Sequence, residues 1–306
     1  MRFISRSILL AIKATALLLS LATVVLSAAP EGKMLRLSMD KLVIALKPDK
    51  DPDRMLAGKE ALQNYLSGKL GCEVKVIVPL NAAIITEGFA NGSLDLGYLS
   101  STGVAKANKL GLADVLLAGE INGKTHYLSY WVSLKEKSYV SVEDLKGKPV
   151  AFSSRSSTSG FLIPVWDLYQ KGHITQTDGP ESFFGKGNVY YGVGYVSAVE
   201  RVLNGMAEAA AVSYYVLDKD RHLSAAQRAK LKMVTSQGPV PTHVIAYRES
   251  LAEKDRRLLK AALLQFNEEK PELRDTVFNS RLVEVDQAEH LNNIRKALDI
   301  VSNMSY

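Results

Sequence analysis

The chain has 306 residues, of which 47% are hydrophobic and 23% are charged. This composition excludes a disordered or fibrous chain and provides enough apolar material for one large domain or two smaller ones. The single cysteine, Cys72, excludes an internal disulfide. Its place in an alternating apolar run favours a buried, unreactive thiol over a ligand or a nucleophile.

Net charge and motifs exclude several classes of function. The formal net charge is +6, and three of the positive charges lie in the first 13 residues, so the remainder carries too little charge to bind nucleic acid. The five histidines are scattered, which predicts neither a metal site nor a charge-relay set. The segment 192–197, GVGYVS, ends in serine where the dinucleotide-binding pattern ends in glycine, so no cofactor is predicted.

Residues 1–28 have the organisation of a secretory signal. Three basic residues precede an apolar core at 14–26, and small residues follow at 27–29. Cleavage after Ser27 or Ala28 is expected. The alternative is an uncleaved membrane anchor, but the apolar core is shorter than the roughly 20 residues that span a bilayer. We therefore expect an exported protein.

Strand and helix patterns alternate in the first part of the chain after this signal. Apolar alternation and β-branched residues predict strands, and apolar residues at helical spacing predict helices. In chain order the pattern predicts strand 41–46, helix 51–71, strand 73–80, helix 82–92, strand 93–100, helix 102–111 and strand 113–120.

The second part continues the alternation and ends in two amphipathic helices. Strands separated by single helices favour an α/β fold with mostly parallel sheets. The predicted order is strand 126–136, a short helix and strand within 141–152, helix 158–172, strand 187–192, helix 195–205, a strand leading into a helix at 206–216, strand 241–250, and helices 251–269 and 285–301.

The two halves of the chain share a pattern. Segments 87–100 and 200–213 each contain a helix end, an Asn-Gly stop, an acidic residue three positions later and an apolar strand that ends at serine. Two similar α/β lobes would explain this repetition. The alternative is coincidence, because a helix, an Asn-Gly turn and a strand often follow one another in unrelated proteins. Clefts between such lobes are preferred ligand sites.

A run of hydroxyl side chains occupies positions 153–159, where only Arg155 interrupts five serines and a threonine. The run lies between a predicted strand and a predicted helix, and the first N–H groups of a helix have no intrahelical partner. Ser157, Thr158 and Ser159 would add hydroxyl donors there, and Gly160 would let the backbone approach a ligand. Anion binding is one interpretation, and a simple helix N-cap is the other.

Four segments in this order resemble the substrate-binding proteins of ABC importers for phosphate, phosphite and phosphonate. They are LVIALKPDKDPDRM, NGSLDLGYLS, STSGFLIP and GYVSAVERVLNG, and the resemblance spans about residues 40–250. It implies a two-lobed, type II periplasmic binding protein (Venus flytrap) fold with a hinge. It also implies an oxyanion held by Ser157, Thr158 and Ser159 and faced by an aromatic residue of the first lobe, for which Tyr98 is the candidate.

This chain departs from many relatives at two positions. Tyr195 stands where they have histidine, and Glu208 stands where they have aspartate. Tyrosine still offers an O–H donor but is not a cation near neutral pH. A carboxylate at 208 would favour a ligand that carries a proton, so phosphite, phosphate and phosphonate all stay open.

We expect lobe 1 to comprise residues 35–125 plus 246–306 and lobe 2 residues 126–245, with hinge segments near 125–130 and 240–246. We expect a periplasmic monomer that closes on a small oxyanion, and the resemblance implies that it docks on an ABC permease in the inner membrane. One alternative is a periplasmic sensor that presents the anion to a receptor kinase, and another is an exported enzyme acting on phospho- or acyl-esters. A single hydroxyl at a helix start, with no base readable from the sequence, does not predict catalysis.

Overall fold

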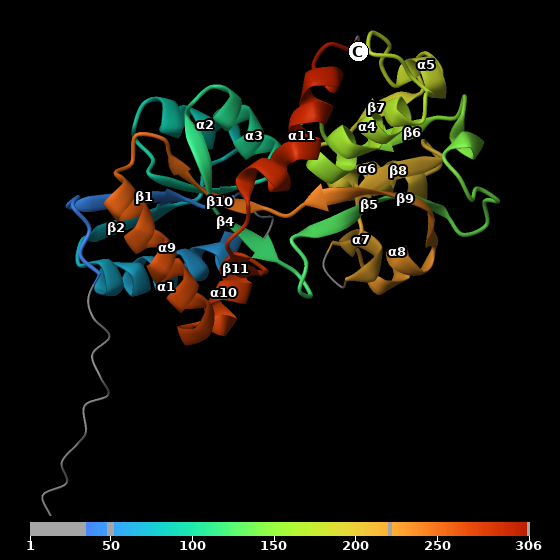
Figure 1. Cartoon of the computed structure of the whole chain (residues 1–306). Helices are drawn as coiled ribbons and strands as arrows, with labels where there is room; N and C mark the ends of the chain where they lie inside the picture. The colour runs from blue at the N-terminus through green and yellow to red at the C-terminus, as the bar shows by residue number, and fades with distance from the viewer. Residues whose placement is uncertain (1–34, 48–51, 220–221, 305–306) are drawn as a thin grey trace, which may run out of the picture. The chain divides into compact units, whose positions relative to one another are not determined.

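The computed structural model describes residues 35–47, 52–219 and 222–304 (Figure 1). The signal predicted at residues 1–28 lies outside these ranges. A search of the described helices finds none with the length and apolar character needed to cross a membrane.

The first sheet has the strand order β11-β4-β10-β3-β1-β2. Strands β1 and β2 and strands β1 and β3 are parallel, whereas β10 is antiparallel to both β3 and β4, and β11 is antiparallel to β4. The strands are β1 (Lys41–Ala45), β2 (Glu73–Ile77), β3 (Leu96–Leu99), β4 (Ala113–Glu120), β10 (Val244–Arg248) and β11 (Arg281–Val283).

The second sheet has the order β7-β6-β8-β5-β9. Strand β6 is parallel to β7 and β8, and β5 is antiparallel to β8 and β9. Strands β6 and β8 are buried throughout because helices cover both faces. The strands are β5 (His126–Leu134), β6 (Val150–Phe152), β7 (Val189–Tyr191), β8 (Ala209–Ser213) and β9 (Leu231–Pro241).

Helices cover both faces of each sheet. Helices α1, α9 and α10 pack on one face of the first sheet, and α2 and α3 pack on the other (Figure 1). The described helices are α1 (Pro52–Leu70), α2 (Ala83–Ala90), α3 (Ser101–Lys109), α4 (Ile163–Gln170), α5 (Glu181–Phe184), α6 (Tyr195–Leu203), α7 (Tyr215–Asp218), α8 (Ala225–Ala229), α9 (Glu253–Glu269), α10 (Pro271–Val277) and α11 (Gln287–Val301), with shorter turns η1 (Glu143–Leu145) and η2 (Thr158–Leu162).

The α/β class and the two-lobed architecture are confirmed, but the sheets are mixed rather than mostly parallel. The reason lies in the connections between the sheets. Strand β4 leads to β5, and β9 leads to β10, without an intervening helix. Strands joined by crossover helices run parallel. Strands β5 and β10, which each follow a direct connection from the other sheet, run antiparallel to their neighbours.

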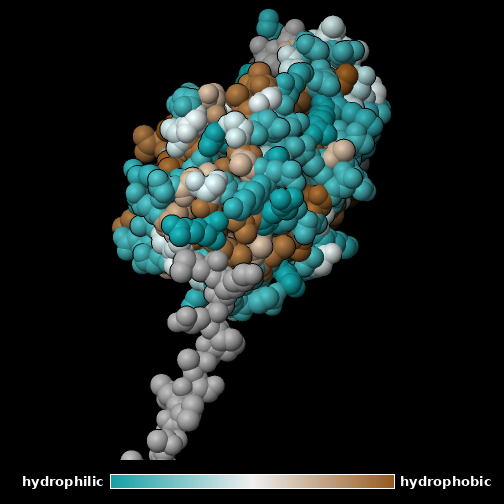
Figure 2. Space-filling view, turned by 60° about the vertical axis from the view of Figure 1, so that its left-hand side comes forward, coloured by the Kyte–Doolittle hydropathy of each residue, from teal (hydrophilic) through white to brown (hydrophobic). Residues whose placement is uncertain are grey.

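Each sheet has its own core. Leu62, Leu66 and Leu70 of α1 recur at four-residue spacing and are buried in the core of the first sheet. Trp131 and Phe152 are fully buried in the core of the second sheet. On the face drawn in Figure 2, hydrophobic residues are interspersed with hydrophilic ones.

The lobe boundaries stay a prediction, because the described residues from 35 onward belong to one compact unit. Helix α11 was assigned to the first lobe by that prediction. Its residues Ile294, Ala297 and Val301 lie in the buried cluster of the second sheet, and the helix packs against both α3 and α4. Figure 1 shows it running from the first sheet toward α4.

Candidate functional site

The hydroxyl run connects β6 to a continuous helix made of η2 and α4. Ser157 has an extended backbone and is the N-cap, because its Oγ accepts a hydrogen bond of 2.9 Å from the Gly160 N–H. The capping interpretation therefore accounts for one hydroxyl of the run. It leaves Thr158 and Ser159, which are both buried in the first turn.

Gly160 is needed for close packing. A Cβ atom at this position would lie 2.5 Å from Ser153 Cβ and 2.9 Å from Ser157 Oγ. Ser153 is held in turn by its hydrogen bonds to the main chain, donating from Oγ to the Ala211 carbonyl over 2.8 Å. The glycine thus lets the helix start lie directly against the serine loop, while its own N–H is taken by the cap.

Three helix starts meet around Thr158 and Ser159. Thr102, in the first turn of α3, shares a hydrogen bond of 2.7 Å with Thr158 through their hydroxyls. Ser159 Oγ shares one of 2.7 Å with the hydroxyl of Tyr195, the first residue of α6. Because each helix start carries partial positive charge and unpaired N–H groups, this convergence favours an anion.

Ser159 is arranged to donate. Tyr127 donates to Ser159 Oγ over 3.4 Å, and Tyr195 can donate to the same atom. A hydroxyl oxygen accepts two hydrogen bonds, so its own proton is then available for a ligand. Burial raises the pKa of Tyr127 well above its usual value, which keeps that phenol protonated as a donor.

A buried polar row extends the site across the second sheet. Ser129 of β5 pairs in register with Ser213 of β8 and Gln237 of β9. Ser129 donates to the Ser159 carbonyl over 2.6 Å and accepts from Gln237 Nε2 over 2.8 Å. Within the described part of the chain, Ser213 Oγ and Gln237 Oε1 are buried and have no hydrogen-bond partner. Such orphaned groups call for a further partner.

None of these three residues was predicted from the sequence as a site residue. One signal was available for Ser213, because it is the serine that ends the repeated pattern at 200–213. For Ser129 the signal was weaker: Ser129 lies two residues before the buried Trp131 and therefore on the same face of the strand. Gln237 lies in a strand that the sequence pattern did not predict.

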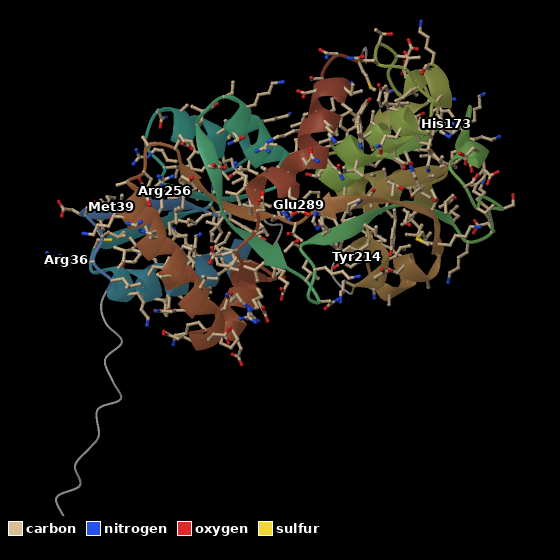
Figure 3. The ribbon with its side chains drawn as sticks, in the orientation of Figure 1. Arg36, Met39, His173, Tyr214, Arg256 and Glu289 are labelled. Carbon is tan, nitrogen blue, oxygen red and sulfur yellow. The ribbon has the colours of Figure 1, made fainter. Side chains whose placement is uncertain are left out.

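Tyrosine rings flank the hydroxyl cluster. Tyr127 contacts Tyr214 at 5.7 Å between ring centroids, and Tyr195 contacts Tyr215 at 5.5 Å. Figure 3 labels Tyr214, which lies between β8 and α7. These partly buried rings restrict the space next to Ser159.

Tyr98 lies on the first sheet, with its ring packed against Phe278 at 5.1 Å and against His243 at 5.7 Å. Its hydroxyl donates to the Phe278 carbonyl over 2.7 Å. This bond directs the phenol oxygen toward the segment between α10 and β11. The structure therefore gives the Tyr98 hydroxyl a partner on the first sheet, and Tyr98 is also close enough to contribute to the raised pKa of Tyr127 in the hydroxyl cluster.

The structure does not bring Glu208 to the cluster. Glu208 precedes β8, whereas Ser213 ends it, and five residues of a strand span about 17 Å. The Glu208 carboxylate accepts from Lys137 Nζ over 2.8 Å and from the Tyr139 hydroxyl over 3.0 Å. The hydrogen bond from Lys137 lowers the pKa of Glu208. The carboxylate is therefore ionised and bonded to Lys137 and Tyr139 at the opposite end of β8.

The donors around Ser159 are neutral side chains: Thr102, Tyr127, Thr158 and Tyr195. Among the residues with described positions, no group of three or more histidine, cysteine, aspartate or glutamate side chains has a metal-binding arrangement. The cluster can hold an anion through dipoles and hydroxyls, and it offers no charged base for chemistry.

Comparison with known proteins identifies relatives. Residues 44–290 match the family described as "ABC transporter, phosphonate, periplasmic substrate-binding protein". The phosphate-import protein PhnD of Mycolicibacterium smegmatis is 23% identical over 184 residues. That match covers 59% of this chain and 57% of PhnD, so the chain spans little more than half the length of this curated relative.

Solved structures share the fold. XAC2383 from Xanthomonas citri bound to chloride has a TM-score of 0.74 at 20% identity, over 87% of this chain and 99% of that one. PhnD1 from Prochlorococcus marinus in complex with methylphosphonate has a TM-score of 0.72 at 21% identity, over 86% and 99%. The aliphatic sulphonate binding protein SsuA of Escherichia coli has a TM-score of 0.55 at 16% identity, over 86% and 84%.

At these identities the structural likeness shows the fold, which is that of the type II periplasmic binding proteins. The resemblance inferred from STSGFLIP and its companion segments is confirmed by the family match, which covers most of the chain. The chain belongs to the family of periplasmic substrate-binding proteins of phosphonate ABC transporters.

Proposed function

We propose that this protein captures a small phosphorus oxyanion, such as phosphite, phosphate or a phosphonate, and delivers it to an ABC permease in the inner membrane. The observation that carries the proposal is the convergence of three helix starts on buried hydroxyls at Thr102, Thr158 and Ser159. The names of the relatives support it, since one is a phosphate-import protein and another was solved with methylphosphonate.

The orphaned oxygens of the buried row suggest which form of the anion binds. Gln237 Oε1 accepts hydrogen bonds and cannot donate them. A phosphorus oxyanion that retains one proton offers the matching P–O–H donor, whereas sulfate offers none at neutral pH. The proposed site therefore selects a proton-bearing oxyanion, with Ser159, Thr158 and Ser157 at the helix start and Tyr195 at their side.

The ligand would enter by displacing the hydrogen bond between Thr102 and Thr158, which joins α3 to η2. In the proposed cycle the two lobes open, accept the anion and close, so that helix starts from both lobes face it. We further propose that the signal at 1–28 directs export to the periplasm and that the protein acts as a monomer. No observation favours the sensor alternative, and the family consists of transporter binding proteins rather than enzymes.

Calorimetry against phosphite, phosphate, methylphosphonate and sulfate tests this proposal. We expect a phosphorus oxyanion to bind more tightly than sulfate. Replacing Ser159 by alanine removes a donor to a charged ligand and should weaken the best ligand about 10- to 100-fold. Ser156→Ala is the matched control, because Ser156 is exposed and its hydroxyl shares a hydrogen bond with Ser154, outside the hydroxyl cluster. Unchanged binding by Ser159→Ala, with the fold preserved, would contradict the site.

A further inference from the structure

Three connections between the sheets pass through one region. Residues 121–125 lead from β4 to β5, residues 242–243 lead from β9 to β10, and residues 284–286 lead from β11 to α11. The first two touch, because the Thr242 N–H and Oγ1 both donate to the Thr125 carbonyl, over 3.0 and 2.9 Å. Any relative movement of the two sheets must change the geometry here.

Two histidines meet at this junction. His126 is the first residue of β5 and is half-buried, whereas His290 lies in α11 and is only 2% exposed. Their ring centroids are 5.3 Å apart. Neither ring nitrogen of His290 forms a hydrogen bond of ordinary geometry with any described residue, although the Thr242 main chain lies nearby. A buried imidazole in this environment is held neutral.

Among the described residues, no carboxylate is hydrogen-bonded to the His290 ring. Glu289, labelled on α11 in Figure 3, favours the charged form of His126. Three charged groups on the packed elements have partners of their own: Lys109 of α3 with Asp299, Arg295 of α11 with Asn108, and Asp114 of β4 with the Val115 N–H and Asn108. Burial and, to a smaller extent, the neighbouring His126 together lower the pKa of His290 to about 4.

We propose that His126 and His290 form a proton-sensitive contact that holds α11 across the junction only while both rings are neutral. Protonation of His290 places a charge in a nearly fully buried position, and protonation of His126 places a charge beside that buried ring. The described packing of α11 then becomes less favourable than an arrangement in which α11 has moved and both imidazole rings are solvated. The two sheets would separate more readily in acid, whether or not a ligand is present.

The direction of the effect follows from linkage. The folded-state pKa of His290 lies below the value of about 6.5 for a solvated imidazole. Neutral His290 therefore stabilises the described packing of α11 fully above about pH 6.5, and this stabilisation is lost as the pH falls toward about 4. Burial lowers the pKa of His126 as well, so both rings act in the same direction.

Small-angle scattering of the ligand-free protein between pH 8 and 4.5 tests the proposal, with far-UV circular dichroism to confirm that the helices persist. We expect the radius of gyration to increase below pH 6.5 in the wild type. His290→Leu should remove this increase, and His126→Gln should reduce it. Because no ligand is used, the result does not depend on the proposed oxyanion.

His173→Gln is the matched control, because His173 bonds to Glu143 and lies in the second sheet's outer loops, away from the junction (Figure 3). It should behave as the wild type does. If His290→Leu does not fold, the His290 imidazole pKa measured by NMR in the wild type decides instead, with a value near 4 expected. A wild type whose dimensions do not change with pH, or a His290 pKa near 6.5, would overturn the proposal.

Discussion

Arg155 is the one charged residue of the hydroxyl run. Its guanidinium lies 4.1 Å from the Tyr191 ring centroid, and that ring stacks on Phe152 at 5.9 Å. The side chain is exposed and lies three residues before Thr158. A cation fixed on an aromatic ring beside an otherwise neutral site attracts anions before they enter it.

We expect Arg155→Gln to slow the association of an oxyanion and to leave its dissociation rate unchanged. Two unit charges about 10 Å apart in water interact by roughly 0.4 kcal/mol, which corresponds to about a twofold change in rate. Stopped-flow kinetics at low and high salt measures it, because salt should remove the difference. Arg201→Gln is the control: Arg201 stacks on Tyr190 at 5.0 Å but lies six residues beyond the start of α6. An unchanged association rate at low salt would contradict this role.

At the scale of one element, the helix start at 158 depends on Gly160. Alanine there would place its Cβ 2.5 Å from Ser153 Cβ, and overpacking of this kind costs about 1–3 kcal/mol. We expect Gly160→Ala to lower the thermal midpoint by several degrees and to weaken oxyanion binding. Gly68→Ala in α1 is the control, because a Cβ there meets nothing within 4 Å, and alanine should raise stability slightly. A melting curve that Gly160→Ala leaves unchanged would contradict the packing argument.

Elements with local signals could be predicted from the sequence, and elements that depend on distant partners could not. The apolar periodicity of α1 and α11 predicted both helices within a few residues. Strand β9 (Leu231–Pro241) was missed, because Gly238 and Pro239 are typical of loops. Its pairing with β5 over most of its length overrides that local preference.

The same distinction holds for the candidate site. Ser157–Ser159 could be proposed as site residues because a strand, a hydroxyl run and a helix follow one another in sequence. Ser129, Ser213 and Gln237 are brought together by register across three strands, which no local pattern encodes. Glu208 was assigned to the site by its spacing from an Asn-Gly stop, but strand direction places it at the opposite end of β8.

At the scale of the whole molecule, the bond between Thr102 and Thr158 joins the site's two halves. Thr102 follows β3 of the first sheet and Thr158 follows β6 of the second, and their hydroxyls are 2.7 Å apart and buried. Thr102→Val keeps the shape of the side chain but leaves the Thr158 hydroxyl without this partner, at a cost of about 1–3 kcal/mol.

We therefore expect Thr102→Val to increase the radius of gyration of the ligand-free protein at pH 7.5, because a contact between the two sheets is lost. It should also weaken oxyanion binding about tenfold or more, because the same hydroxyl is a proposed ligand donor. Thr102→Ser restores the hydroxyl and should recover both properties. If the valine variant binds as the wild type does, Thr102 contributes to neither closure nor recognition, and the ligand would have to be held by the second sheet alone.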